Sequence, residues 1–458
     1  MELKNKKVTL VGLGRSSVAA ALLLQQHGAR PFITEVGCSR THDRWRAQCA
    51  EQGIMCETGG HSEEACERAE LIVLSPGVPL TAPLVAEARR RGIPITGELE
   101  LASRFCNARI IAVTGTNGKT TVTAMLHAMI IACGHSVGLA GNNDTPLSQI
   151  ALLRDQPEWV VVEVSSYQLE TTETFHPEIA VVLNITPDHL SRHGTLEQYA
   201  AIKARIFEQQ QPGDSAVRNM DDPLVAAMPV PEKIRAFGFS MHTSDKNTVF
   251  ADADNIYFED MQVASRADNP LPGSHNLQNV LAALAAIRAG GFHWEKSLQG
   301  LRRFKGVEHR IEYVMSLEGV DYYNDSKATN LESLRVALES FQRPVVLLAG
   351  GRGKGSNYAQ LSALIRERVK KIIAFGEDAP LIMTAYDGCT DVELAMSMMD
   401  AVNRARTAAT TGDVVLLSPA CASFDMYDNF EARGRDYKDC LQRLTVSGAP
   451  VTNEEERA

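Results

Sequence analysis

The amino-acid sequence predicts an α/β protein built from three units, each with a mostly parallel sheet. Three observations support this fold class. Short apolar runs typical of buried strands alternate with helix-like stretches along nearly the whole chain. Several of these runs end in glycine-rich or polar turns. At 458 residues the chain is also too long for one ordinary core, so two to four domains are expected.

Composition excludes several classes of protein. The apolar content of 44% and the charged content of 22% are typical of a globular protein in water. The net charge is −10 without a basic block, which disfavours a nucleic-acid binder. The nine cysteines form no C-x-x-C pair, so neither a zinc knuckle nor a disulfide framework is predicted, and a reducing cytoplasm is expected. The sequence contains no apolar run of about 18 residues and no signal-like start, so we predict no membrane segment.

The first unit begins with a strand over Lys7–Leu13 and the turn Gly12-Leu-Gly14-Arg-Ser-Ser17. A helix from Val18 and a second strand ending at Glu35 follow, which is similar to the start of a dinucleotide-binding unit. Ser17 replaces the third glycine, so an NAD site is not favoured, and a βα turn without a ligand is an equal alternative. The strand Leu71–Leu74 ends in Ser75-Pro-Gly77. Three strand ends therefore meet at one sheet edge, where such domains bind ligands.

The second unit starts at a phosphate-binding loop. The strand-like run Ile110–Thr114 enters a glycine-rich turn, and the helix-like stretch Val122–Ala132 follows. Glycines let backbone N–H groups approach a polyphosphate, and the helix directs its positive end at that charge. Lysine can reach a terminal phosphate and threonine can hold Mg²⁺. The spacing is two residues shorter than the usual loop, and a plain turn with an exposed lysine is the alternative. The expected phosphate-binding residues are Gly115, Thr116, Asn117, Gly118, Lys119, Thr120 and Thr121.

Two further strands of this unit end in metal-ligating side chains. Glu163 lies near the end of the apolar run Trp159–Val164, where a carboxylate is costly unless it is paired or bound to a cation. The alternative is an exposed edge strand. The apolar run Ile179–Ile185 leads into His189, with His193 as a competitor. Because parallel strands end at the same sheet edge, we expect Glu163 and His189 beside the phosphate loop as metal ligands.

Other polar residues have ordinary explanations from the sequence alone. Lys203 lies in an amphipathic stretch, Gln198–Gln209, and composition predicts a solvated lysine. Asn276 and Asn279 lie at the start of the predicted helix Val280–Ala289, where the ordinary role of asparagine is helix capping.

The third unit begins near Arg310. A strand from Val320 enters a polar turn, a helix follows over Leu331–Phe341, and the apolar strand Pro344–Ala349 comes next. The glycine-rich stretch after it contains Lys354, a second candidate for anion binding. The strand Asp413–Leu417 then opens into another polar loop.

These motifs, in this order, resemble the Mur ligase family over nearly the whole chain. The loop Gly115-Thr-Asn-Gly-Lys-Thr120 is shared across that family. The turn Asn324-Asp-Ser-Lys-Ala-Thr-Asn330 resembles the members that join D-glutamate to UDP-N-acetylmuramoyl-L-alanine. The supporting motifs are Ser75-Pro-Gly77, His309-Arg310, Gly350-Gly-x-Gly-Lys354 and Ser418-Pro-Ala-Cys-Ala-Ser423. Another Mur-type or folylpolyglutamate-type ligase, and a catalytically inactive nucleotide-binding protein, are the alternatives.

The resemblance implies a cytoplasmic, monomeric, ATP-dependent amide ligase of peptidoglycan precursor synthesis. It implies a Rossmann-like UDP-sugar domain over residues 1–107 and a central P-loop mononucleotide-binding ATPase domain over 108–308. A Rossmann-like amino-acid domain would span 309–458. The substrates would be ATP, UDP-N-acetylmuramoyl-L-alanine and D-glutamate, and two Mg²⁺ ions would assist. We expect these domains to close during turnover, because the implied ligands lie on all three.

The resemblance also assigns site residues. Lys203 matches a family lysine that CO₂ converts to a carbamate, which supplies an anionic oxygen beside Mg²⁺ where an ammonium would repel the ion. The implied metal ligands are Thr120, Glu163, His189 and carbamylated Lys203. The implied catalytic residues are Lys119, Lys203, His189 and Asn142. Further nucleotide contacts are Asn276, Asn279, Arg310 and Asp325. The UDP-substrate residues are Ser16, Ser17, Glu35, Ser75, Gly77, Asn142 and Ser165. The D-glutamate residues are Lys327, Thr329, Lys354, Ser423 and Phe430.

Two positions depart from the family pattern. Glu35 stands where the family usually has aspartate, and Asn143-Asp144 replaces the more common Ile-Gly.

Overall fold

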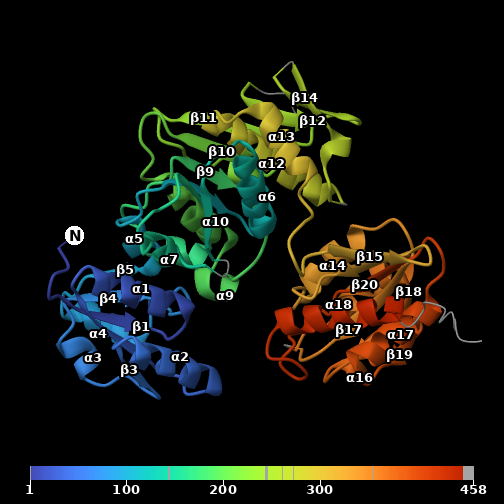
Figure 1. Ribbon diagram of the computed structural model, residues 1–458, viewed down its shortest axis with the longest axis horizontal. Helices are drawn as coiled ribbons and strands as arrows, with labels where there is room; N and C mark the ends of the chain where they lie inside the picture. Colours follow the sequence, from blue (N-terminus) through green and yellow to red (C-terminus); the bar gives the residue numbers. More distant parts are fainter. Residues whose placement is uncertain are drawn as a thin grey trace, which may run out of the picture. The chain divides into compact units, whose positions relative to one another are not determined.

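The computed structural model describes residues 2–142, 145–242, 246–259, 261–271, 273–353 and 355–446. It contains three mostly parallel sheets with helices packed on them, which confirms the predicted α/β fold class (Figure 1). The chain forms two compact units, Met1–Asn269 with His275–Phe304, and Pro270–Ser274 with Lys305–Ala458. Two of the sheets belong to the first unit and the third sheet belongs to the second.

The N-terminal sheet has the parallel strand order β3-β2-β1-β4-β5. Leu10 packs in the apolar core on one face, whereas the next residue, Val11, packs in the core on the other face. The strand order reverses between β1 and β4, and such a reversal opens a crevice at the carboxyl ends of the two strands. The elements are β1 (Lys7–Val11), α1 (Arg15–Gln26), β2 (Arg30–Glu35), α2 (Arg40–Glu51), β3 (Met55–Thr58), α3 (Glu64–Glu67), β4 (Leu71–Leu74), α4 (Pro83–Arg90), β5 (Ile95–Gly97) and α5 (Glu98–Ser103).

The central sheet has the order β14-β13-β12-β11-β10-β9-β6-β8-β7. Strand β13 runs antiparallel to both of its neighbours, β12 and β14, whereas the other described strand pairs of this sheet are parallel. Strand β6 lies between β8 and β9, so both neighbours end beside the loop that follows β6. The elements up to the start of α10 are β6 (Arg109–Thr114), α6 (Lys119–Ala132), β7 (Val137–Gly141), α7 (Leu147–Ala151), β8 (Trp159–Glu163), α8 (Ser166–Leu169), β9 (Ile179–Val182) and α9 (Leu190–His193).

The remaining elements of the first unit complete the central sheet and the helices around it. They are α10 (Leu196–Ala204), η1 (Arg205–Phe207), β10 (Ser215–Asn219), α11 (Pro223–Ala226), β11 (Arg235–Ser240), β12 (Thr248–Ala251), β13 (Asn255–Phe258), β14 (Met261–Ser265), η2 (Arg266–Asp268), α12 (Ser274–Gly290) and α13 (Trp294–Arg302). The predicted helix Gln198–Gln209 begins earlier and is broken, because Thr195 and Gln198 form a capping box and the chain tightens into a 3₁₀ turn at Arg205.

The third sheet has the order β15-β16-β20-β17-β18-β19, and only the β15–β16 pair is antiparallel among its described strands. Residues of β17 alternate between two apolar cores, with Leu347 in one core and Leu348 in the other. The elements are β15 (Glu312–Leu317), β16 (Val320–Asn324), α14 (Leu331–Glu339), β17 (Val345–Gly350), η3 (Tyr358–Leu361), α15 (Ser362–Arg368), β18 (Val369–Phe375), α16 (Ala379–Ala385), β19 (Asp391–Leu394), α17 (Met398–Ala408), β20 (Val414–Leu417) and α18 (Phe430–Val446).

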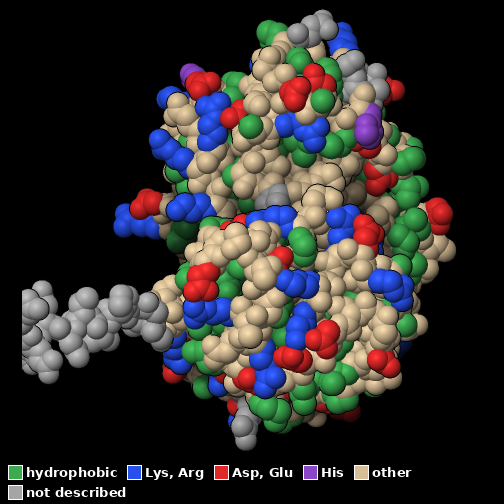
Figure 2. Space-filling model, turned by 90° about the vertical axis from the view of Figure 1, so that its right-hand side faces the viewer, with side chains coloured by type: hydrophobic (Ala, Val, Ile, Leu, Met, Phe, Trp, Pro, Cys, Tyr) green, Lys and Arg blue, Asp and Glu red, His purple; other side chains and the backbone are tan. Residues whose placement is uncertain are grey.

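One face of the molecule carries charged side chains of both signs. Figure 2 shows a face on which Lys and Arg side chains lie interspersed with Asp and Glu side chains. Among the described residues, every helix is too short or too polar to cross a lipid bilayer.

Candidate active site

The loop between β6 and α6 has a backbone that only glycine fits well. Gly118 has a φ of +87°, and a Cβ atom there would lie 2.3 Å from Asn279 Oδ1. A Cβ atom at Gly115, whose φ is +154°, would lie 2.8 Å from Leu183 Cβ. The loop is therefore packed between α12 and the segment after β9, and the two glycines permit both contacts.

Residues after β9 hold this loop through hydrogen bonds. The Thr116 N–H donates to Asn184 O at 2.9 Å, and the Asn117 N–H donates to Asn184 Oδ1 at 2.8 Å. Lys119 Nζ donates to the carbonyl oxygens of Gly115 and Thr116, both at 2.8 Å. The ammonium is thus held over the loop at the amino end of α6, where an anion is favoured. Thr121 follows in the first turn of α6.

Glu163 forms one cluster with two other predicted residues. Its carboxylate accepts a hydrogen bond from Thr120 Oγ1 at 2.7 Å and another from Asn142 Nδ2 at 3.0 Å. The residue is 3% exposed, and its strand β8 lies between β6 and β7, so the edge-strand alternative is wrong. A Cβ atom at Gly141 would lie 2.0 Å from Glu163 O, so the two strands approach closely there. This oxygen-rich donor set suits Mg²⁺.

Lys203 is buried beside the same loop, so the composition-based prediction of a solvated lysine is wrong. The residue is 1% exposed, and its Nζ donates to Thr114 Oγ1 at 3.2 Å and to Gly115 O at 3.0 Å. Burial, together with the nearby Lys119 ammonium, holds the pKa of Lys203 well below its usual value, against the opposing effect of Glu163 and a second carboxylate. The amine is therefore closer to the neutral state that reacts with CO₂ than an ordinary lysine is.

The two histidines after β9 have different environments. His189 has a φ of +54°, its side chain is 45% exposed, and its ring lies 4.8 Å from the Tyr167 ring. The His193 side chain is fully buried, with Nε2 3.0 Å from Ser166 Oγ and Nδ1 3.3 Å from Glu170 Oε1. Burial lowers the pKa of His193. His193 thus belongs to an internal polar network, whereas His189 keeps an accessible imidazole.

The crevice between β1 and β4 brings predicted UDP-substrate residues together. Ser17 Oγ and Ser75 Oγ lie 2.5 Å apart, and a Cβ atom at Gly12 would lie 2.9 Å from Ser75 Cβ. Glu35 accepts hydrogen bonds from the N–H groups of Leu13 at 2.9 Å and Gly37 at 2.6 Å. The Glu35 carboxylate therefore orders the turn after β1, and Gly77 lies exposed in the turn after β4.

A cleft of about 330 Å³ lies next to this crevice, within the first unit. It is lined by Arg15, Ser16, Trp45, Pro76, Glu98, Gly141, Asn142, Pro146 and Gln168. Ser16 and Asn142 were predicted from the sequence. Ser165 caps α8 and bonds Gln168 rather than lining the cleft itself. Asn143 and Asp144, which follow Asn142, lie outside the described residues.

The sequence analysis did not assign the charged, aromatic and amide side chains Arg15, Trp45, Glu98 and Gln168 of the cleft to a site. Arg15 lies within the turn that was singled out, so its position could have been noticed. Glu98 gave no local signal: it is 3% exposed and accepts hydrogen bonds from Ser148 N at 2.8 Å and Ser148 Oγ at 2.7 Å. Burial raises the pKa of Glu98.

The predicted nucleotide contacts divide between the two units. Asn276 and Asn279 are buried on α12, with Asn279 Nδ2 donating to Asn276 Oδ1 at 3.1 Å, and Asn279 packs on the phosphate loop. In the second unit, Asp325 accepts hydrogen bonds from Ser418 Oγ at 2.8 Å and Ile311 N at 3.2 Å. Burial raises the pKa of Asp325 to about 7, although these bonds and the nearby Arg310 oppose the shift.

The predicted amino-acid residues surround the strand ends of the third sheet. Lys327 Nζ lies 5.1 Å from the centre of the Phe430 ring. Buried Arg433 donates to Ser326 O at 2.7 Å and to Cys421 O at 3.1 Å, and so ties the turn after β16 to the loop after β20. Ser423 is buried in that loop and Thr329 is partly buried. Lys354 lies outside the described residues.

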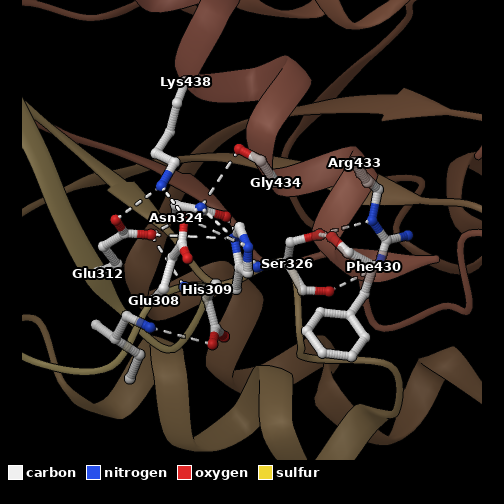
Figure 3. Close-up of polar contacts among 11 residues, drawn as sticks. Glu308, His309, Glu312, Asn324, Ser326, Phe430, Arg433, Gly434 and Lys438 are labelled. Atoms are coloured by element: carbon white, nitrogen blue, oxygen red, sulfur yellow. Dashed lines mark hydrogen bonds and ion pairs between the residues drawn. The ribbon is translucent and has the colours of Figure 1, made fainter. Parts of the chain in front are cut away.

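A second polar cluster in this unit has the composition of a metal site. Glu308, His309 and Glu312 offer ligand atoms within 4.8 Å of one another, the one such group among the described residues (Figure 3). However, Lys438 Nζ donates to Glu308 Oε1 and, at 3.1 Å, to Glu312 Oε1. Asn324 Nδ2 lies 2.9 Å from His309 Nδ1. The lysine already balances the two carboxylates, so we interpret this cluster as an ion-pair network that supports Asn324.

The fold and the site together define a class of protein. A parallel sheet with a glycine-lysine-threonine loop, a buried glutamate that bonds the loop threonine and a buried lysine is an arrangement typical of nucleotide-binding proteins.

Comparison with known proteins places the chain within that class. Residues 6–97 match the MurD-like N-terminal domain of Mur ligases, residues 113–287 the Mur ligase middle domain, and residues 309–421 the Mur ligase glutamate ligase domain. The chain belongs to the Mur ligase family, which confirms the prediction made from its motifs.

Its relatives include several ligases with one name. The UDP-N-acetylmuramoylalanine–D-glutamate ligase of Acidobacterium capsulatum is 43% identical over 449 residues, which is 96% of this chain and 97% of the relative. The ligase of the same name from Koribacter versatilis is 42% identical over 97% of this chain and 99% of its own. The fold is similar to that of UDP-N-acetylmuramate-alanine ligase MurC from Thermotoga maritima, with a TM-score of 0.61 and 18% identity over 96% of this chain and 99% of the other.

Proposed function

We propose that this protein joins D-glutamate to UDP-N-acetylmuramoyl-L-alanine and converts ATP to ADP and phosphate. The observation that carries the proposal is identity of 42–43% over nearly the full length to ligases that are named for this reaction. We assign the UDP-sugar to residues 1–107, ATP to residues 108–308 and the amino acid to residues 309–458. We propose a cytoplasmic monomer that acts in peptidoglycan precursor synthesis.

The proposed chemistry activates a carboxylate that is a poor electrophile by itself. The alanyl carboxylate attacks the γ-phosphorus of ATP, the bond to ADP breaks, and an acyl phosphate forms. The D-glutamate amine then attacks the acyl carbon, loses a proton and expels phosphate. In this scheme Lys119 and the amino end of α6 hold the transferring phosphoryl group, because positive charge that is already in place stabilises the transition state.

Mg²⁺ fits the cluster around Glu163. Half-buried Thr120 and buried Glu163 offer oxygen ligands 2.7 Å apart, and His189 adds an accessible imidazole. Two bound ions would neutralise the phosphate oxygens and let the two anionic substrates approach each other. Asn142 would then orient the UDP-substrate, because it bonds Glu163 and also lines the cleft.

Lys203 suits the proposed carbamate. Its amine is buried and its pKa is lowered, so a neutral amine is available to add CO₂ with release of one proton. The product carries anionic oxygens close to Thr114 and Gly115, where an ammonium would repel a metal ion.

A screen of amino-acid acceptors tests the proposed function. Phosphate release is measured with ATP, Mg²⁺ and UDP-N-acetylmuramoyl-L-alanine in the presence of D-glutamate, L-glutamate, meso-diaminopimelate or L-lysine. We expect release only with D-glutamate, and loss of release in Lys119→Ala with the fold intact. Release with meso-diaminopimelate or L-lysine instead would assign the chain to another ligase, and release with none of the acceptors would support a nucleotide-binding protein without catalysis.

A further inference from the structure

We infer that Arg192 is a positioning residue that connects the turn after β4, in the UDP-sugar domain, to the segment that carries His189. The inference rests on the proposed function, because it assigns the turn to the UDP-substrate and His189 to the metal. Arg192 belongs to neither predicted site. It lies on α9, three residues after His189, and its side chain is 17% exposed.

The guanidinium reaches across the first unit to a backbone carbonyl. Arg192 Nη2 donates to Val78 O at 3.1 Å, and Val78 follows the Ser75-Pro-Gly77 turn directly. The same nitrogen donates to Glu170 Oε2 at 2.5 Å, and Nε donates to both Glu170 oxygens at 3.1 Å. The Glu170 carboxylate therefore fixes the plane of the guanidinium, and the remaining donor direction holds the turn.

A second set of contacts joins Arg192 to His189. The Arg192 Cζ atom lies 4.4 Å from the centre of the Tyr167 ring, and that ring lies 4.8 Å from the His189 ring. The backbone N–H of Arg192 also donates to the backbone oxygen of His189 at 2.9 Å. The imidazole of His189 is 45% exposed, so Tyr167 and the short helix α9 provide the packing that orients it. One residue thus holds both the metal-ligand segment and the substrate turn.

The lining of a small hollow supports this connection. Ser75, Pro76 and Val78 line it from the N-terminal domain, and Tyr167 and Arg192 line it from the central domain. Movement of the substrate turn would displace Arg192 and, through Tyr167, would change the setting of His189. Bound UDP-substrate and bound metal should therefore affect each other's affinity, and thermodynamic linkage makes this coupling mutual.

The planar guanidinium is what this position requires. It presents several donors in a fixed fork, so it can bond Glu170 in two places, bond Val78 O and stack on Tyr167 at the same time. The ammonium of Arg192→Lys keeps the charge but lacks both the fork and the flat face. If Arg192 only stabilised the fold, this substitution would lower the unfolding temperature without selecting among the substrates.

Steady-state kinetics of the full-length protein separate these two roles. We expect Arg192→Lys to raise KM for UDP-N-acetylmuramoyl-L-alanine about tenfold, the loss of one charge-assisted hydrogen bond. We also expect it to raise several-fold the Mg²⁺ concentration that half-maximally stabilises the substrate-free protein against thermal unfolding. KM for D-glutamate should stay within about twofold of the wild-type value, because the residues assigned to D-glutamate belong to the second unit. Arg218→Lys is the matched control, since Arg218 Nη1 holds two carbonyls, Ala226 O at 2.9 Å and Met228 O at 3.0 Å.

Each outcome decides the inference. An active Arg192→Lys variant with unchanged KM for the UDP-substrate and unchanged Mg²⁺ dependence overturns it. Equal rises in KM for the UDP-substrate, KM for D-glutamate and the required Mg²⁺ concentration, or rises matched by Arg218→Lys, also overturn it. If Arg192→Lys does not fold, Glu170→Gln replaces it, because this change loosens the guanidinium and should raise the same two parameters by a smaller factor. Failure of the proposed function is seen separately, as a wild-type protein that releases no phosphate with these substrates.

Discussion

Replacing Lys203 by methionine tests both the burial of this amine and its proposed carbamate. Methionine is a flexible side chain of similar length, so the change removes the amine without leaving a large cavity. Gly115 O keeps a donor, because Lys119 Nζ also bonds it at 2.8 Å. The loss therefore amounts to about one hydrogen bond, ~1 kcal/mol.

The lowered pKa of Lys203 determines whether Lys203→Met raises or lowers the stability of the protein. Burial and the Lys119 ammonium depress this pKa in the folded protein below its value in the unfolded chain, usually 10.5. Between these two pKa values the unfolded chain binds one more proton, so the stability of the wild type falls as pH decreases through that window. Within that window each unit of pH decrease lowers the free energy of unfolding of the wild type by about 1.4 kcal/mol. This loss already exceeds the contribution of the hydrogen bond that the variant lacks. Lys203→Met should thus unfold at an equal or higher temperature than the wild type at about pH 7, and its advantage should shrink toward about pH 10.

Thermal unfolding in CO₂-free buffer, followed by addition of bicarbonate, is the assay. Because CO₂ would bind only the folded wild type, bicarbonate should raise the unfolding temperature of the wild type and leave Lys203→Met unchanged. ATP-dependent phosphate release should fall at least about a thousandfold in the variant, as expected for the loss of a metal-binding anion at a phosphoryl-transfer site. A variant that unfolds several degrees below the wild type at about pH 7 would refute the burial argument, and full turnover would refute the carbamate.

Two further substitutions test other parts of the site. Gly118→Ala should raise KM for ATP about tenfold, because its Cβ atom would lie 2.3 Å from Asn279 Oδ1. Gly134→Ala is the control, since Gly134 also has a positive φ, +92°, but has nothing within 4 Å of the added atom, and an equal effect of the two would contradict the steric reasoning. Asp325→Asn should remove a pH dependence of stability. The pKa of Asp325 is about 7 in the folded protein and usually 3.8 in an unfolded chain. The free energy of unfolding of the wild type is therefore greatest below about pH 4 and falls by up to about 4 kcal/mol as pH rises to about 7. Thermal unfolding measured across this pH range checks the slope, which the variant should lack and whose absence from the wild type would contradict the raised pKa.

Local patterns in the sequence were enough to predict the α/β fold class and the loop between β6 and α6. The run of apolar strands and helix-like stretches is a local pattern, because burial on both faces of a parallel sheet requires continuous apolar residues. The loop could be recognised because its pattern is contiguous: Gly115 to Thr121 are seven neighbouring residues whose types and spacing are typical of a phosphate-binding loop. The family motifs could be recognised for the same reason, because each of them is a short run of neighbouring residues.

The burial of side chains and the contacts between distant residues could be learned only from the three-dimensional structure. Lys203 belongs to a helix whose composition predicts exposure, yet it bonds Thr114, 89 positions away in the sequence. Glu163 meets Thr120 across 43 positions because β8 lies beside β6, and Glu98, which lines the cleft, accepts a hydrogen bond from Ser148, 50 positions away on another helix. The pKa of a group depends on the desolvation and charges around it, and these come from segments that are distant in the chain. Sequence periodicity does not encode such contacts, so the electrostatics of this site follow from the packing of the sheets and helices.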